Sequence, residues 1–320
     1  LRIPHAARPI LPPRIGRFLF RPFPHGLRRF SRATRHANDI RSRRPASIPV
    51  PLTIASWNIN SVRLRIDLVE RLIDERNPDV ICLQETKCPD EQFPSAMLTK
   101  RGYTHLAISG QKGYHGVAIA SRVPFAATSK RGFCGIPDAR HICVDLVDGG
   151  ATPLRLHNFY VPAGGDEPDP DKNVKFKHKL DFLHEMLDWA HTAPHETGHK
   201  DRAVLVGDLN VAPLEDDVWS HKQLLKVVSH TPVETELLTR VQDELGWVDV
   251  MRRHVPVPAK LFTWWSYRNQ DWRKSNRGRR LDHVWASPDV APSCTRIEVM
   301  EDARDWPRPS DHVPVLAVFG

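Results

Sequence analysis

The residues best suited to chemistry are a carboxylate and a carboxamide two positions apart, Asp208 and Asn210. They follow residues 203–206, an apolar run stopped by Gly207, which predicts the end of a buried strand. Side chains two positions apart on a strand point to the same side, so both reach one point in space. Such a pair can bind a hard metal ion and orient a water molecule. A simple strand-ending turn is the alternative, and it is favoured for this run taken alone.

Four more runs of polar residues beside strand-like segments favour a functional site over a simple turn. They are SWNIN at 56–60, QETK at 84–87, RLDH at 280–283 and SDH at 310–312. Each follows or opens an apolar, strand-like segment, and strand ends and their loops are where layered scaffolds place chemistry. Turn residues alone do not explain five such runs, so we interpret them as one site. Its candidate residues are Asn58, Glu85, Asp208, Asn210, Asp282, Asp311 and His312.

Carboxylate and carboxamide oxygens suit Mg²⁺, with Mn²⁺ as an alternative, better than zinc. Glu85 is the expected first ligand. Mg²⁺ usually takes only one or two protein carboxylates and keeps several waters, so not all candidates bind one ion. The remaining candidate metal residues are Asn58, Asp208, Asn210, Asp311 and His312.

From residue 52 onward, strand-like and helix-like patterns alternate without a linker. Residues 61–76 carry apolar side chains at helical spacing and are stopped by Asn77-Pro78. A second helical face runs from residue 176 to 190. Residues 231–234 read as a capping box with Pro at the first helical position, which opens a helix ending at Gly246. Periodicity alone indicates helices with strands in two or more layers. The His-rich run 191–201 is expected to be a solvated loop.

Composition limits the class of protein. No run of about 18 apolar residues occurs, so no membrane span is expected. The chain has five cysteines and no Cys-x-x-Cys, which indicates neither a disulfide framework nor a zinc knuckle. Cys82 and Cys143 lie in apolar runs and are expected in the core.

The net charge of +8 comes from the first 50 residues. They hold twelve Arg, eight Pro and one acid, which leaves 34 basic and 37 acidic residues in the rest of the chain. This segment is predicted to be a disordered extension, with the catalytic domain at 51–320. Three explanations are open: an organelle targeting peptide, a basic arm for nucleic acid, or an upstream extension from a wrongly assigned start. We favour the last, because the chain begins with Leu1.

The chain resembles the exonuclease III family of DNA-repair nucleases, within the endonuclease/exonuclease/phosphatase superfamily. The resembling segments, in the family's order, are SWNINSVR, ICLQETK, KGYHGVAIASR, NFYVPAGG, VLVGDLN, FTWWSYR, NRGRRLDHVWAS and PSDHVPV. The resemblance implies a four-layer α/β sandwich of two packed mixed sheets flanked by helices. It also implies an abasic-site endonuclease that cuts 5′ to the lesion, with 3′→5′ exonuclease and 3′-end trimming activity. A cytoplasmic, nucleoid-associated monomer acting on duplex DNA, with no membrane partner, is expected.

The resemblance also implies roles for the site residues. Asp208 serves the attacking water or the leaving oxygen, and Asn210 stabilises charge in the transition state. His312 is expected to bond a phosphate oxygen, with Asp282 holding its other ring nitrogen. Tyr160 offers its phenol to the scissile phosphate. His283, next to Asp282, is expected to point the other way.

Residues 262–280 are expected to contact DNA, because they interleave six basic residues with five aromatic ones. Tyr267 and Arg268 are candidate contacts within this run. The resemblance implies that Trp264 lines the pocket for an extruded abasic sugar. For Trp265 and Trp272 a core position is equally compatible. Two other functions stay open: another phosphodiesterase of the superfamily, or a catalytically dead nucleic-acid-binding regulator.

Overall fold

The computed structural model describes residues 51–150, 152–269 and 271–320. They belong to one compact unit, Ile48–Gly320. The extension predicted at 1–50 lies outside the described residues. Within the described part of the chain, no helix is long and apolar enough to cross a membrane.

One sheet holds six strands: β1 (Leu52–Asn58), β2 (Val80–Gln84), β3 (His105–Ser109), β4 (Val117–Ser121), β11 (Cys294–Val299) and β12 (Val315–Phe319). Their order is β11-β12-β1-β2-β4-β3. Only β1 and β2 run parallel, and helix α1 (Ile66–Arg76) makes the crossover that a parallel pair needs.

The second sheet repeats this plan with β5 (Phe125–Ser129), β6 (His141–Leu146), β7 (Leu154–Tyr160), β8 (Ala203–Asp208), β9 (Val248–Asp249) and β10 (Asp282–Ala286). Their order is β5-β6-β7-β8-β10-β9. The parallel pair is β7 and β8, connected through helix α3 (Val174–Thr192). The other neighbours are antiparallel.

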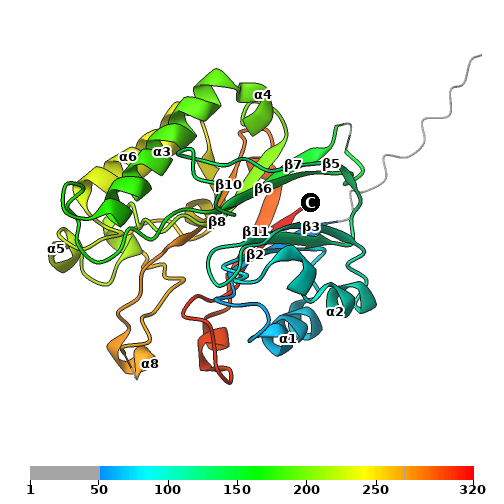
Figure 1. Cartoon of the computed structure of the whole chain (residues 1–320), viewed down its shortest axis with the longest axis horizontal. Coiled ribbons are helices and arrows are strands. Elements are labelled where there is room, and N and C mark those ends of the chain that lie inside the picture. The colour runs from blue at the N-terminus through cyan, green and yellow to red at the C-terminus, as the bar shows by residue number, and fades with distance from the viewer. Residues whose placement is uncertain (1–50, 151, 270) are drawn as a thin grey trace, which may run out of the picture. The chain divides into compact units, whose positions relative to one another are not determined.

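The two sheets pack face to face, with helices on both outer faces (Figure 1). Helices α1 and α2 (Ser95–Lys100) cover the first sheet, while α3 and α6 (Pro232–Glu244) cover the second. The predicted four-layer α/β sandwich is therefore confirmed. The shorter helices are α4 (Pro194–Thr197), α5 (His221–Leu224), α7 (Val250–His254), α8 (Trp272–Ser275), and the 3₁₀ turns η1 (Asp90–Gln92), η2 (Glu215–Asp217), η3 (Ala291–Ser293) and η4 (Glu301–Asp305).

The central strands are buried on both faces, which explains why they read as continuous apolar runs. Every residue of β2, β4, β8 and β10 is buried. Between the sheets, Cys82 of the first and Val206 of the second belong to one hydrophobic core. Cys143 is buried too, so the core positions predicted for both cysteines are confirmed.

The predicted start of α1 is wrong, whereas the predicted start of α6 is confirmed. The first begins at Ile66 rather than Ser61, because Asn60 and Ser61 have left-handed φ values of 48° and 85°. It ends at Asn77 as predicted. Helix α6 begins at Pro232 after Thr231, and its capping box is present. Both ends of that helix agree with the sequence, since Leu245 caps it just before Gly246.

The sequence analysis predicted neither three of the strands nor the short helices α2, α4, α5, α7 and α8. Strands β3 and β5 lie at sheet edges, and β9 has only two residues, so none shows a strong apolar pattern. The loop expected at 191–201 is partly wrong, because residues 194–197 form α4 and Thr197 and His199 are buried.

Candidate active site

The candidate residues meet at one edge of the sandwich. In the second sheet, Tyr160, Asp208 and Asp282 are register partners at the ends of three neighbouring strands. In the first, Asn58 ends β1 and Glu85 follows β2. The two sheets are joined here, since Asn58 Nδ2 donates to Asp208 Oδ2 at 2.9 Å. Parallel strands and their antiparallel neighbours thus deliver all five side chains to one place.

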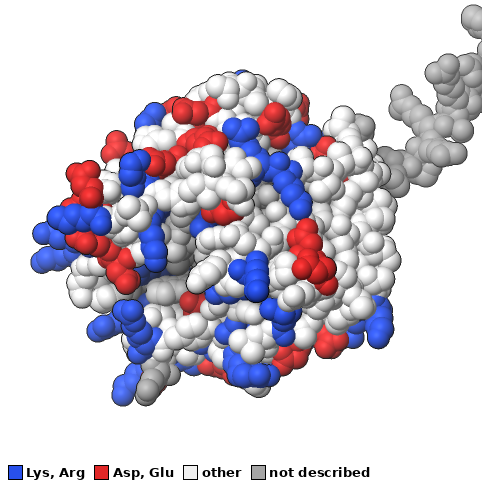
Figure 2. Space-filling model, in the orientation of Figure 1, with Lys and Arg blue, Asp and Glu red and all other residues white. Residues whose placement is uncertain are grey.

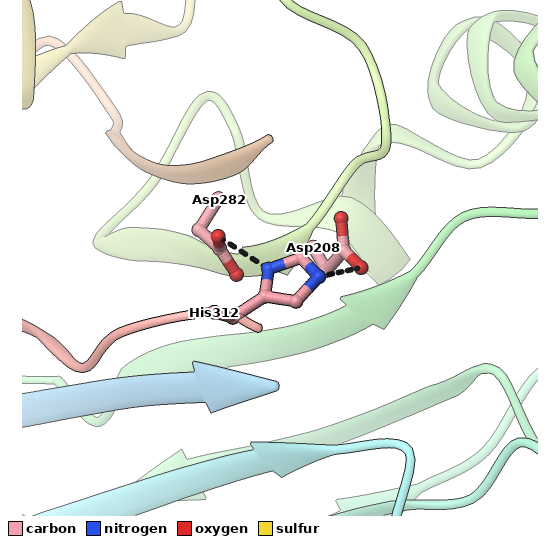
Figure 3. Close-up of side chains that lie close together, drawn as sticks. All are labelled: Asp208, Asp282 and His312. Carbon is pink, nitrogen blue, oxygen red and sulfur yellow. Dashed lines mark hydrogen bonds and ion pairs between the residues drawn. The ribbon is translucent and has the colours of Figure 1, made fainter. Parts of the chain in front are cut away.

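His312 lies between two carboxylates (Figure 3). Its Nδ1 is 2.8 Å from Asp282 Oδ2, and its Nε2 is 3.6 Å from Asp208 Oδ2. All three side chains are buried. Burial would lower the pKa of His312, but the charges of Asp282 and Asp208 outweigh it and raise that pKa to about 10. The ring is therefore an imidazolium at neutral pH, and it contacts Asp282, the partner that the family resemblance implies.

Asp208 is surrounded by donors. Its Oδ2 accepts from Asn58 Nδ2 at 2.9 Å and from Asn210 Nδ2 at 3.1 Å, and its Oδ1 accepts the backbone N–H of Asn210 at 2.9 Å. Burial, together with the Asp282 and Glu85 charges, raises the pKa of Asp208 to about 7, against the opposing effect of His312. A carboxylate that gains a proton near neutral pH is suited to proton transfer.

Glu85 lies on the other side of Asn58. Its Oε1 accepts from Asn58 Nδ2 at 2.9 Å, and its Oε2 forms an ion pair with Lys87 Nζ at 2.7 Å. Burial would raise the pKa of Glu85, but the charge of Lys87 and these hydrogen bonds lower it. The carboxylate is thus ionised, which is the state that metal binding requires.

Asp311 is connected to this group through Asn60. Its Oδ1 accepts from Asn60 Nδ2 at 3.1 Å and its Oδ2 from Trp264 Nε1 at 2.9 Å. Lys87 Nζ also donates to Asn60 Oδ1 at 2.6 Å, so Lys87 and Asn60 bridge Glu85 to Asp311. Both bridging residues were missed by the sequence reasoning. Asn60 had a signal, because it lies two positions after Asn58, on the same side of the chain.

The donor set fits a hard divalent cation. Among the described residues, the cluster of carboxylate and imidazole atoms within 4.8 Å of one another consists of Asp208, Asp282 and His312. These three form an ion-paired row in which, among the described residues, Asp282 Oδ1 has no partner, whereas Glu85 and Asp311 lie outside the row and line the pocket described below. Glu85 therefore stays our first ligand, with Asp311 next, and oxygen ligands of this kind suit Mg²⁺ or Mn²⁺.

Tyr160 lies beside Asp208 on β7 and is almost fully buried. The Arg140 guanidinium lies over its ring, 4.9 Å from the centroid, and donates to its backbone carbonyl at 3.3 Å. Burial and the charges of Glu85 and Asp208 raise the pKa of Tyr160 well above its usual value. The phenol consequently keeps its proton and can act only as a donor to an anionic group.

Replacing Tyr160 by Phe is expected to slow phosphodiester cleavage by ~10²–10³-fold, the typical cost of losing one preorganised donor. The ring keeps its packing against Arg140, so folding should be retained. Single-turnover rates measure the effect, with Tyr114→Phe as control because Tyr114 is 69% exposed. A Tyr160→Phe protein that cuts as fast as the wild type contradicts the role.

A pocket of about 550 Å³ opens beside these residues and is lined by Glu85, Asn210, Asp311 and His312. We call its apolar lining residues the apolar wall and its three arginines the basic rim. The apolar wall consists of Trp219, Leu224, Val227, Val228, Trp264 and Leu281, and the basic rim consists of Arg268, Arg277 and Arg279; one further acid, Asp166, also lines the pocket. Figure 2 shows a hollow in this face with Lys and Arg side chains beside it. The pocket suits a group that has both an anionic and a weakly polar part.

The predicted DNA-contacting residues separate into two groups. Trp264 and Arg268 line the pocket, whereas Tyr267 is half-exposed outside it and donates to the carbonyl of Pro309 at 2.8 Å. Trp265 and Trp272 are buried in the hydrophobic cluster that α1 forms with the first sheet. Of the two positions left open for them, DNA contact or core, the core is therefore correct. His283 bonds the carbonyl of Val211 at 2.8 Å, away from Asp208 and His312, as expected.

Comparisons with known proteins identify the family of the chain. The pattern of the endonuclease/exonuclease/phosphatase family matches residues 55–312. The chain is 32% identical over 273 residues to the exodeoxyribonuclease III of Haemophilus influenzae, which covers 82% of this chain and 98% of that one.

Two solved structures have similar folds. One is an AP endonuclease from Archaeoglobus fulgidus, with a TM-score of 0.75 and 32% identity over 84% of this chain and 99% of that chain. The other is a 3′ phosphatase from Neisseria bound to a product DNA hairpin, with a TM-score of 0.75 and 30% identity over 84% of this chain and 99% of that chain.

Proposed function

The chain belongs to the endonuclease/exonuclease/phosphatase family, and we propose that within it this protein is a divalent-metal-dependent DNA-repair nuclease. It is an enzyme, a hydrolase that acts on phosphodiester bonds. The proposed activity is incision of duplex DNA 5′ to an abasic site, together with 3′→5′ exonuclease and 3′-end trimming activity. The proposed partner is duplex DNA with abasic sites or 3′ ends, bound by a monomer.

The observation that carries this proposal is the buried row Asp282–His312–Asp208 beside a pocket with a basic rim. Attack on a phosphodiester builds negative charge on oxygens that are already anionic. An imidazolium, a carboxamide and a phenol fixed in advance stabilise that charge more than mobile water does. His312, Asn210 and Tyr160 supply these three donors.

Each residue has a distinct role in the proposed mechanism. Asp208 orients the attacking water and accepts its proton, because its pKa lies near neutral pH. His312 donates to a phosphate oxygen, while Asp282 keeps the imidazolium charged and oriented. Asn210 Nδ2, whose two N–H groups bond Asp208 Oδ2 and the Val161 carbonyl, orients Asp208 and donates to the phosphate by exchanging its bond to Asp208. Glu85 and Asp311 would hold the divalent metal, which when bound would supply further positive charge near the phosphate.

The pocket favours a damaged nucleotide over an intact one. A base-free sugar lacks stacking and pairing, so extruding it from the duplex costs little. Trp264 and the apolar wall fit such a sugar, and Arg268, Arg277 and Arg279 fit the flanking phosphates. Selectivity for damage then requires no contact with base edges.

Incision of a labelled duplex that carries one tetrahydrofuran abasic analogue tests the function. Metal-dependent cutting 5′ to the analogue is expected. Binding without cutting would indicate a nucleic-acid-binding regulator, and neither binding nor cutting would indicate a different phosphodiester substrate.

Removal of divalent metal is expected to abolish cutting. Excess chelator should stop the reaction, Mg²⁺ or Mn²⁺ should restore it, and Ca²⁺ should inhibit it. Glu85→Gln should raise the Mg²⁺ concentration needed for activity by at least ~10–100-fold. That is the usual cost of losing a hydrogen-bond partner of a metal ligand, and losing the ligand itself should cost no less. Rates measured across a Mg²⁺ titration check this, with the exposed Glu236→Gln as control. Full activity in chelator contradicts the metal site.

A further inference from the structure

A buried ion pair lies directly behind Asn210. Lys179 of α3 and Glu234 of α6 contact each other, and both side chains are completely buried. A buried pair of charges contributes little net stability, because desolvation offsets much of the attraction. Capping α6 explains Glu234 in part, but it does not explain Lys179. The pair therefore calls for a role beyond holding two helices together.

The Lys179 ammonium joins two segments that line the site. It donates to the backbone carbonyl of Asn210 at 2.7 Å and to that of Ala163 at 3.4 Å, besides its bond to Glu234. These three acceptors account for its three N–H groups. Asn210 follows β8 and Ala163 follows β7, so one ammonium fixes the loops after both parallel strands.

Glu234 adds a third segment. Its carboxylate accepts the backbone N–H of Ser229 at 3.0 Å and that of Thr231 at 3.2 Å. Ser229 Oγ in turn accepts from Arg279 Nη1 at 2.8 Å, and Arg279 lies over the ring of Trp264. The Glu234 carboxylate thus holds Ser229, which in turn contacts Arg279 of the basic rim.

Asn210 is held at both polar groups of its backbone. Its φ is +54°, a left-handed value that is uncommon outside glycine, although Asn adopts it more readily than most residues. Its N–H bonds Asp208 Oδ1 and its carbonyl bonds Lys179, while its side chain bonds the carbonyl of Val161 at 2.9 Å and Asp208 Oδ2 at 3.1 Å. Lys179 therefore helps to hold the backbone that carries the carboxamide.

We propose that Lys179 is a positioning residue, which together with Glu234 holds the Asn210 carboxamide and the pocket wall at Ser229 in the orientation that cleavage requires. This inference rests on the proposed function. It differs from a purely structural role, in which the pair stabilises the fold and affects cleavage only through unfolding.

The Lys179→Met variant tests the proposal, because Met keeps the length of the side chain and removes the ammonium. We expect kcat to fall at least ~10-fold with little change in KM, since small misplacements of reacting groups cost up to about 10²-fold in rate. Lys177→Met on the same helix is the control, because Lys177 is 59% exposed and pairs with the half-exposed Asp181. Equal kcat in Lys179→Met and wild type overturns the proposal.

Two further variants separate positioning from stability. In Lys179→Met/Glu234→Gln the uncompensated carboxylate is gone, so the melting temperature should recover while kcat stays low. Recovery of kcat together with the melting temperature assigns a structural role and overturns the proposal. The double variant also serves if Lys179→Met alone does not fold.

A double-mutant cycle with Asn210→Ala decides whether the effect passes through Asn210. In single-turnover reactions, Lys179→Met should slow the wild type but not the Asn210→Ala protein. An equal loss in both backgrounds overturns the proposal. A wild-type protein that cuts no abasic duplex refutes the proposed function, whereas cutting by a wild type that Lys179→Met leaves unchanged refutes this inference alone.

Discussion

The Asp208→Asn variant is expected to incise abasic duplex ~10²–10⁴-fold more slowly than the wild type, the range typical of losing a general base. The amide has nearly the shape of the carboxylate but cannot take a proton from water. It also removes a negative charge that faces His312 Nε2 at 3.6 Å. Both changes act on the chemical step, so the loss should appear in kcat rather than in DNA affinity.

The surroundings of Asp208 strengthen this expectation. The groups that bond its oxygens are all donors, namely Asn58 Nδ2, Asn210 Nδ2 and the N–H of Asn210. Whichever way an Asn side chain is turned, its NH₂ group faces one of these donors. A buried donor without an acceptor costs about 1–3 kcal/mol, so the melting temperature should also fall modestly.

Single-turnover incision and thermal melting together measure both effects. Asp243→Asn is a matched control, because Asp243 is exposed on α6 and far along the chain from the site. Duplex binding should persist in the Asp208→Asn protein. Turnover close to wild type, with an intact fold, contradicts the role of Asp208 as base.

Much of the fold was predictable because its signals are local. Strands buried on both faces are continuous apolar runs, as in β8, and Asp208 and Asn210 follow such a run directly. The α6 capping box needs only Thr231, Pro232 and Glu234 in sequence. Edge strands lack this signal, and the start of α1 depends on left-handed residues that no periodicity reveals.

The candidate site was predictable in its strand-end residues but not in their support. The capping-box pattern predicted a local role for Glu234 as a helix cap, yet its bond to Lys179 connects residues 55 positions apart. No spacing rule connects residues so far apart. The sequence also could not show that Trp265 and Trp272 are buried, since a run that mixes aromatic and basic residues does not reveal which rings enter the core.

The His312→Asn variant is expected to lose ~10²–10³-fold in incision rate, because it removes a charged donor to the phosphate. An Asn side chain can still donate one hydrogen bond toward Asp282, but it carries no positive charge. Thr263 Oγ1 continues to donate to Asp282 Oδ2 at 2.6 Å, which leaves that carboxylate with a partner. The incision rate should therefore fall strongly while the melting temperature changes little.

The pH dependence of the rate distinguishes loss of this imidazolium from general damage. The pKa of His312 is raised to about 10, so the wild-type ring stays protonated through neutral pH and loses its charge as the pH rises through that value. Wild-type cutting should accordingly decline on the alkaline side near pH 10, and His312→Asn should lack that decline. An alkaline decline that persists unchanged in the variant assigns it to another group. Because the charges of Asp282 and Asp208 both raise this pKa, the alkaline decline lies well above the ordinary range of a histidine, and its loss in His312→Asn assigns it to the ring between the two carboxylates.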